Sequence, residues 1–126
     1  MRKPRENDMT TKDYFAYKGN YGTYHDCHFI TNRYCDNYNL YLGIVSETEG
    51  LICTCSVNTP RKLDDDRIAV KNYSENTSMV ERLVGLGIIE EKADDYIPSG
   101  FVWIPVHKLT ASGLELFKDV PNGCED

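Results

Sequence analysis

The sequence predicts an α+β fold in which an antiparallel sheet of five or six strands carries one main amphipathic helix on one face. Three observations lead to this expectation. Apolar and polar residues alternate on both sides of a Gly-containing turn within residues 39–57, as they do in antiparallel strands. Apolar residues then follow helical spacing over 79–86. The length of 126 residues suits one hydrophobic core, so these elements are expected to pack together in a single domain.

The first half of the chain is expected to form two hairpins. Aromatic, β-prone segments at 14–19 and 21–30 surround the turn signal Gly19-Asn20 and predict the first hairpin. The polar segment 46–50 predicts the turn of the second hairpin. Its two strands each place apolar side chains on one face, namely Leu40, Leu42 and Ile44 on the first strand, and Leu51, Cys53, Cys55 and Val57 on the second.

The main helix is predicted between Ser74 and Gly87. Ser74 is a favoured N-cap residue, and Glu75 lies in the first turn, where a carboxylate is stabilising. Gly87 is a natural stop because glycine adopts the left-handed conformation at low cost. The helix would therefore have about three turns.

The remaining elements are predicted on both sides of this helix. A strand is expected at 67–73, and an acidic loop followed by a turn at 90–100. The apolar segment 101–109 predicts the last strand. Pro105 indicates that this strand lies at a sheet edge or a bulge, because proline cannot donate to a ladder. A short helical turn is expected around Leu114, Leu116 and Phe117.

The domain organisation follows from these patterns. Residues 1–12 have no periodicity and contain Pro4, so they predict a disordered arm. Residues 13–120 are expected to form the α+β domain, and residues 121–126 a flexible tail.

The composition predicts a protein of a reducing cytoplasm. No apolar run approaches the ~20 residues of a membrane-spanning helix, and the charged N-terminal segment lacks the apolar core of a signal peptide. The five cysteines are odd in number and irregularly spaced, which favours free thiols over a disulfide framework. We therefore expect a cytoplasmic protein without membrane association.

The charge is uneven along the chain. Residues 1–12 contain four basic and two acidic side chains, so residues 13–126 carry −8 against a total of −6. An acidic field repels nucleic acid and attracts basic protein surfaces. We therefore expect a basic protein as partner and no direct binding of DNA or RNA.

Catalytic and metal-binding chemistry is weakly represented. No phosphate-binding glycine loop, nucleophile elbow or HExxH motif is present, so we expect a non-enzymatic protein without a cofactor. His25 and Cys27 would share one strand face, and with Cys53 and Cys55 from a neighbouring strand they are the weak candidates for a zinc site. The CxC spacing is not the usual one for zinc, so a bound metal is not expected. A thiolate metal-binding protein stays an alternative.

The acidic loops are the candidate contact surface. Carboxylates in loops commonly form solvated surface, but here they stand beside aromatic residues that suit protein interfaces. Both interpretations stay open at this point. The candidate partner-binding residues are Asp64, Asp65, Asp66, Glu75, Asn76, Glu90, Glu91, Asp94, Asp95, Tyr96 and Phe101.

The segment 70–109 resembles the C-terminal half of an uncharacterised family of short proteins that phages, plasmids and other bacterial mobile elements carry. With the preceding hairpin, the resemblance covers half to two-thirds of the chain. It implies the same α+β fold and supplies no catalytic residues. It rests on Val70-Lys71, Tyr73-Ser74-Glu75-Asn76, Gly87-Ile88, Ile97-Pro98-Ser99-Gly100-Phe101-Val102 and Pro105-Val106.

Small acidic proteins of mobile elements include inhibitors of host defence, such as anti-CRISPR and antirestriction proteins. The resemblance thus implies an inhibitor, in first place an anti-CRISPR protein, that docks an acidic surface on a basic CRISPR or restriction effector in the bacterial cytoplasm. A sponge for nucleotide signals is the second hypothesis, because the tyrosine-rich first half could supply stacking walls. The oligomeric state stays open, with a homodimer among the alternatives.

Overall fold

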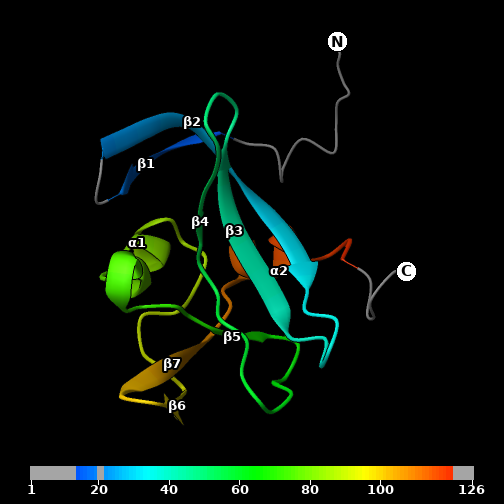
Figure 1. The fold of residues 1–126 in the computed structure, drawn as a ribbon. Helices are drawn as coiled ribbons and strands as arrows, with labels where there is room; N and C mark the ends of the chain where they lie inside the picture. Colours follow the sequence, from blue (N-terminus) through cyan, green and yellow to red (C-terminus); the bar gives the residue numbers. More distant parts are fainter. Residues whose placement is uncertain (1–13, 20–21, 121–126) are drawn as a thin grey trace.

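The computed structural model describes residues 14–19 and 22–120 (Figure 1). The predicted arm at 1–12 and the predicted tail at 121–126 lie outside the described residues, as does Asn20 of the first predicted turn. The described part is mostly β, with two α-helices and one 3₁₀ turn. Its elements are β1 (Phe15–Gly19), β2 (Gly22–Arg33), β3 (Leu40–Ser46), β4 (Gly50–Thr54), β5 (Arg67–Ala69), η2 (Ser74–Asn76), α1 (Met79–Gly85), β6 (Asp95–Ser99), β7 (Val102–Lys108) and α2 (Ala111–Leu116).

The strands form two antiparallel sheets instead of the one that the sequence predicted. The first sheet has four strands in the order β1-β2-β3-β4, and the second has three in the order β5-β7-β6. The α+β class is confirmed, but the single sheet with one main helix is wrong. A loop, residues 58–66, separates β4 from β5, and a bridge between Ser56 and Val70 links the two sheets. Figure 1 shows the three-stranded sheet at one end of the long strands β2 and β3.

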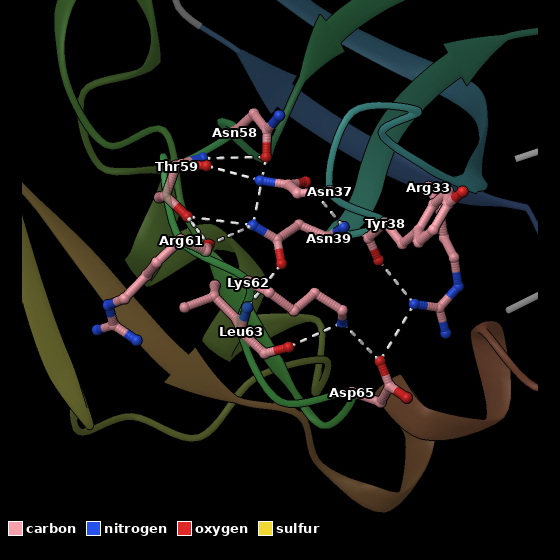
Figure 2. Close-up of polar contacts among 10 residues, drawn as sticks. All are labelled: Arg33, Asn37, Tyr38, Asn39, Asn58, Thr59, Arg61, Lys62, Leu63 and Asp65. Carbon is pink, nitrogen blue, oxygen red and sulfur yellow. Dashed lines mark hydrogen bonds and ion pairs between the residues drawn. The ribbon is translucent and has the colours of Figure 1, made fainter. Parts of the chain in front are cut away.

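The loop 58–66 is held in place by Asn39, the residue before β3 (Figure 2). The side-chain oxygen of Asn39 accepts a hydrogen bond from the backbone N–H of Leu63 at 2.7 Å. The side-chain nitrogen donates to the hydroxyl of Thr59 at 3.1 Å and to the carbonyl of Arg61 at 3.0 Å. Asn39 is 3% exposed, so these bonds satisfy an amide that has lost its water. The network joins the four-stranded sheet to the chain that leads into the three-stranded one.

Period-2 alternation is confirmed in β3 and fails in β4. The three alternating apolar residues of β3 are at most 3% exposed. In β4, Leu51 is 58% exposed, although Cys53 packs against the core. The register explains the difference, because Ile44 pairs with Cys53 and Val45 pairs with Leu51, which leaves Ile52 as the extra residue of a β-bulge. A bulge interrupts the alternation of faces, and the predicted inward face of Leu51 is wrong for this reason.

α1 begins later than predicted. Ser74–Asn76 form a 3₁₀ turn, and the α-helix starts at Met79. The prediction of Ser74 as its N-cap is therefore wrong. The side-chain oxygen of Asn72 instead accepts a hydrogen bond from the backbone N–H of Val80 at 2.8 Å, which satisfies one of the free donors at the start of the helix.

Two glycines, one after α1 and one within α2, allow the turn between the two helices to pack closely. Gly87 adopts a φ of 79° and ends α1 as predicted. The hydroxyl of Thr110 caps α2 by accepting from the N–H of Gly113 at 3.1 Å, and it donates to the carbonyl of Gly87 at 2.5 Å. α2 confirms the predicted helical turn. Gly113 lies so close to the turn after α1 that a Cβ atom there would be 2.2 Å from the carbonyl oxygen of Ile88.

Replacing Gly113 with alanine is expected to lower the free energy of unfolding by about 2–3 kcal/mol, because the added methyl group must push the backbone apart. Urea unfolding measures this loss. Gly85 is a matched control, since it also lies in a helix and, among the described residues, no atom beyond its own helix backbone and chain neighbours lies within 4 Å of its Cβ position. Gly85→Ala is expected to be neutral or to stabilise by up to about 1 kcal/mol. If Gly113→Ala were as stable as the wild type, the close packing of α2 would be refuted.

The hydrophobic core has two parts. The larger part lies between the four-stranded sheet, α1 and the C-terminal end of α2, and the smaller part belongs to the three-stranded sheet. Members of the larger part include Leu42, Ile44, Met79, Leu83, Ile89, Leu109 and Phe117, and the smaller part consists of Leu63, Ala69, Ile97, Ile104 and Val106.

None of the helices in the described residues has the length and apolar character to span a bilayer.

β7 is the central strand of its sheet, so the predicted edge position of Pro105 is wrong. The carbonyl of Pro105 accepts a hydrogen bond from the N–H of Val70 at 3.0 Å. In an antiparallel ladder the N–H and C=O of one residue point to the same side, so the missing donor of Pro105 faces β5. Val70 lies opposite Pro105, so β5 ends at Ala69, where the ladder loses this donor. β6 itself was missed, since its aspartate and proline predicted loop and turn.

Candidate binding site on the β6–β7 hairpin

β6 and β7 sort their side chains onto two faces. The two strands are antiparallel neighbours that pair Ile97 with Ile104 and Tyr96 with Pro105. Ile97 and Ile104 pack into the smaller part of the core. Successive strand residues point to opposite faces, so Tyr96, Trp103 and Pro105 share the outer face of the hairpin.

Three aromatic side chains of this hairpin are exposed. The exposed fraction is 56% for Tyr96, 65% for Trp103 and 107% for Phe101. Phe101 lies in the turn between the strands, after Gly100, whose φ of 60° suits glycine. Three large aromatic side chains left in water on one hairpin are typical of a surface that a partner covers.

A pocket of about 230 Å³ lies on the outer face of the hairpin, between β7 and α1. The hairpin supplies two aromatic side chains, a proline and a histidine. α1, the segment before it and the loop before β6 supply the rest. The lining residues are Asn72, Tyr73, Val80, Glu81, Glu91, Ala93, Tyr96, Trp103, Pro105 and His107.

His107 is a buried residue of this pocket, at 2% exposed. Its Nδ1 atom lies 2.8 Å from the carbonyl oxygen of Glu90. A carbonyl oxygen only accepts, so Nδ1 carries the proton, and Nε2 of the neutral ring is an acceptor. In the described residues, the fully buried side-chain atoms without a hydrogen bond are His28 Nδ1 and Arg33 Nε. The Nε2 atom of His107 is not one of them, and the imidazole of His107 lines the pocket.

Two carboxylates of the pocket, Glu81 and Glu91, are exposed and form no ion pair within the described part of the chain. Both negative charges are thus uncompensated. The pocket combines three aromatic rings, two carboxylates without an ion pair and one imidazole. This arrangement suits a cation with several hydrogen-bond donors.

The predicted aspartates are mostly engaged in ion pairs with the chain itself. Arg67 lies between the two acidic loops and pairs with Asp66 at 2.6 Å and with Asp94 at 2.7 Å. Asp95 pairs with Arg61. The structure therefore brings the predicted acidic loops together, but around cations that offset much of their charge.

Asp65 holds an arginine that is nearly buried. The side chain of Arg33 is 7% exposed, and its Nη1 atom lies 3.1 Å from the Asp65 carboxylate. Lys62 lies 2.9 Å from the same oxygen atom (Figure 2). Hydrogen bonds from Lys62, and then from Arg33, hold the pKa of Asp65 below its usual range. This carboxylate stabilises the fold.

Asp65→Asn is expected to lower the free energy of unfolding by about 1–2 kcal/mol at neutral pH, because Arg33 loses its counter-charge in a poorly hydrated place. A lowered folded pKa means that the stabilisation is present above the unfolded pKa, 3.8, and is lost as the pH falls through the folded value. The wild type and the variant should therefore differ fully at neutral pH and converge in acid, as measured by urea unfolding at several pH values.

Asp64→Asn is the control for this prediction, since Asp64 is exposed and forms no ion pair within the described residues. Its free energy of unfolding is expected to stay within about 0.5 kcal/mol of the wild-type value. A loss in Asp65→Asn that persisted unchanged in strong acid would show that charge is not its cause.

The other predicted contact residues have mixed positions. Glu91 and Tyr96 line the pocket, and Phe101 stands at the tip of the hairpin outside it. Asn76 is buried, and its amide donates to the carbonyl of Thr54 at 2.6 Å, so it is not a surface group. Glu90 is exposed, and the side chain of Glu75 lies outside the described structure.

Sequence reasoning missed Tyr73, Glu81, Trp103 and His107 as site residues. Trp103 is the single tryptophan of the chain, and positions 103, 105 and 107 share one face by strand periodicity. That signal was present but was interpreted as a strand apolar on both faces. Nothing local marked Tyr73 and Glu81, because they reach the pocket only through the packing of α1 and the segment before it.

The weak metal candidates do not converge. His25 is exposed, whereas Cys27 is fully buried. A bulge in β2, between the residues that pair with Phe15 and Tyr17, breaks the alternation that predicted a shared face for His25 and Cys27. In the part of the chain that the structure describes, no three His, Cys, Asp or Glu side chains are placed to hold a metal ion together.

The cysteines are largely part of the interior. Cys27, Cys53 and Cys55 form no disulfide bond, and burial raises the pKa of the Cys27 and Cys55 thiols, so both are protonated and weakly nucleophilic. The Sγ atom of Cys53 donates to the hydroxyl oxygen of Tyr17 at 3.7 Å. Cys35 is disulfide-bonded, so the expectation of free thiols throughout is wrong at this residue.

Comparison with known proteins adds no further information on this site, since no family model, curated protein or solved structure matches the chain.

Proposed function

We propose that this chain is a non-enzymatic binding protein that docks on a basic protein through the aromatic β6–β7 hairpin. The observation that carries the proposal is the exposure of Tyr96, Phe101 and Trp103 beside the uncompensated carboxylates Glu81 and Glu91. Tyrosine and tryptophan are the residues that most often dominate interface energetics. The carboxylates next to them favour a partner with positive charge.

The net charge supports the same class of partner. With −6 on the whole chain, approach to a basic surface is accelerated by electrostatic attraction, and approach to nucleic acid is opposed. Basic surfaces of this kind are typical of nucleic-acid-handling proteins. The proposed partner is a host defence effector, with a CRISPR nuclease as the first candidate and a restriction enzyme as the second. The resemblance of residues 70–109 to proteins of mobile elements supports this choice. The chain would inhibit by occupying the surface that nucleic acid needs.

A nucleotide sponge fits the pocket less well. The tyrosines could stack on a base, but Glu81 and Glu91 would repel its phosphates. Catalysis also lacks a basis here. In the described part of the chain, His107 hydrogen-bonds a backbone carbonyl and no hydroxyl or thiol, so it has no nucleophile to activate.

The proposal is tested with a panel of purified CRISPR nucleases and restriction enzymes, each immobilised separately. The chain is applied at about 0.1 M salt, where charges still attract over about 10 Å, and is eluted by a salt step. We expect stoichiometric retention on one effector, release by salt, and inhibition of nucleic-acid cleavage by that effector. Retention on none of the panel, or retention that salt does not weaken, would contradict the proposal. Self-association in light scattering would instead assign the hairpin to a second copy of the chain.

A further inference from the structure

We infer that the pocket between the β6–β7 hairpin and α1 receives one arginine side chain of the partner. This inference rests on the proposed function, because it names the group that the hairpin recognises. Sites for drug-sized ligands commonly measure roughly 300–1,000 Å³. The pocket, at about 230 Å³, is smaller and matches one long side chain.

The walls of the pocket suit a flat cation. Tyr73, Tyr96 and Trp103 all contribute to its lining. A guanidinium group stacks on aromatic rings and is attracted by the negative potential of their faces. The ring of Tyr73 already has a cation of the chain on it, since Lys71 Nζ lies 6.0 Å from the ring centroid, outside the pocket lining.

The acceptors of the pocket favour arginine over lysine. Glu81 and Glu91 offer carboxylate oxygens, and the imidazole of His107, whose Nδ1 atom is bonded to the carbonyl of Glu90, adds Nε2 as an acceptor of the lining. Five N–H donors in a fixed plane can use acceptors on several sides at once, whereas an ammonium group has three donors at one point. The side-chain oxygen of Asn72 accepts one hydrogen bond from Val80, and its second lone pair adds a further acceptor to the lining.

The fluorescence of Trp103 can report binding in the pocket, because Trp103 is the single tryptophan of the chain and all tryptophan emission comes from it. The test titrates the full chain with hexa-arginine, hexa-lysine and hexa-citrulline peptides at low salt and follows this emission. We expect a saturable change with hexa-arginine, binding at least about tenfold weaker for hexa-lysine, and none for hexa-citrulline, which keeps the shape but loses the charge.

The deciding variant is Glu81→Gln/Glu91→Gln, which keeps the size of both side chains. We expect it to bind hexa-arginine at least about tenfold more weakly than the wild type. Glu49→Gln/Asp119→Asn removes the same charge from two exposed positions away from the pocket and should bind within about twofold of the wild type. Thermal unfolding of both variants checks that the fold is intact.

Three outcomes would overturn the inference: no change of emission with hexa-arginine, equal binding of hexa-lysine, or equal binding by the two double variants. None of them decides the proposed function, because retention on an effector is measured separately. If an effector is retained and the pocket variant binds peptide as well as its control, the hairpin docks without an arginine in the pocket. If the peptide binds as expected and no effector is retained, the result supports an arginine-binding pocket and contradicts the proposed partner.

Discussion

Replacing Asn39 with leucine is expected to lower the free energy of unfolding by about 3–4 kcal/mol. The substitution keeps the branching of the side chain but leaves the buried N–H of Leu63 without a partner, which costs about 1–3 kcal/mol, and it removes the hydrogen bonds to Thr59 and Arg61, each worth about 1 kcal/mol. Because small domains are stable by about 5–15 kcal/mol, this loss is a large fraction of the total. Thermal and urea unfolding measure it directly.

Asn32 provides the control for this experiment. It lies exposed on β2, and its side-chain oxygen accepts only from the N–H of the next residue, Arg33, at 2.8 Å within the described structure. Asn32→Leu is expected to change the free energy of unfolding by no more than about 0.5 kcal/mol. Similar effects of the two leucine substitutions would mean that the Asn39 network does not hold the loop 58–66.

Phe101→Ala and Trp103→Ala are each expected to weaken the binding of the retained effector by about 30-fold or more, the effect of losing an interface residue worth about 2 kcal/mol. Phe101 is 107% exposed, so its removal should leave the stability of the free chain unchanged. Trp103 is 65% exposed, so its replacement should lower the free energy of unfolding only slightly. Affinity is measured by surface-based binding at fixed salt, and stability by urea unfolding of the same samples.

Leu114→Ala is the matched control, because Leu114 is also a large exposed apolar residue, at 44% exposed, and lies on α2 instead of the hairpin. It is expected to leave the affinity within about twofold. An effect of Leu114→Ala as large as that of Phe101→Ala would place the interface elsewhere.

The elements that the sequence predicted are those whose signals are local. The alternation in β3, the stop at Gly87 and the helical turn after Thr110 all depend on neighbours a few residues away. The faces of Leu51 and His25 were predicted wrongly because each lies at or beside a β-bulge. A bulge depends on how a strand pairs with its neighbour, and the sequence of one segment does not determine that pairing.

β6 shows how tertiary pairing overrides local preference. Asp95 and Pro98 predict loop and turn, yet the strand forms because Ile97 is buried opposite Ile104 of β7. Trp103 could not be identified as an exposed partner of Tyr96 while one strand of the hairpin was unrecognised.

The candidate site was predicted in part, through Glu91, Tyr96 and Phe101. The aspartates were predicted as a free acidic surface, but Asp94 and Asp95 pair with arginines that lie 27 and 34 residues away in the sequence. Compensation over such separations depends on the fold. Only the structure distinguishes these aspartates from the uncompensated Glu81 and Glu91.

The central claim is that the β6–β7 hairpin and the pocket beside it form the binding surface. Hydrogen–deuterium exchange of the chain, alone and saturated with the retained effector, tests this claim most directly. We expect new protection in residues 72–81 and 91–107, and unchanged exchange in the turn 46–50 at the far end of the four-stranded sheet. Protection confined to the four-stranded sheet, with the hairpin exchanging as in the free chain, would contradict the claim.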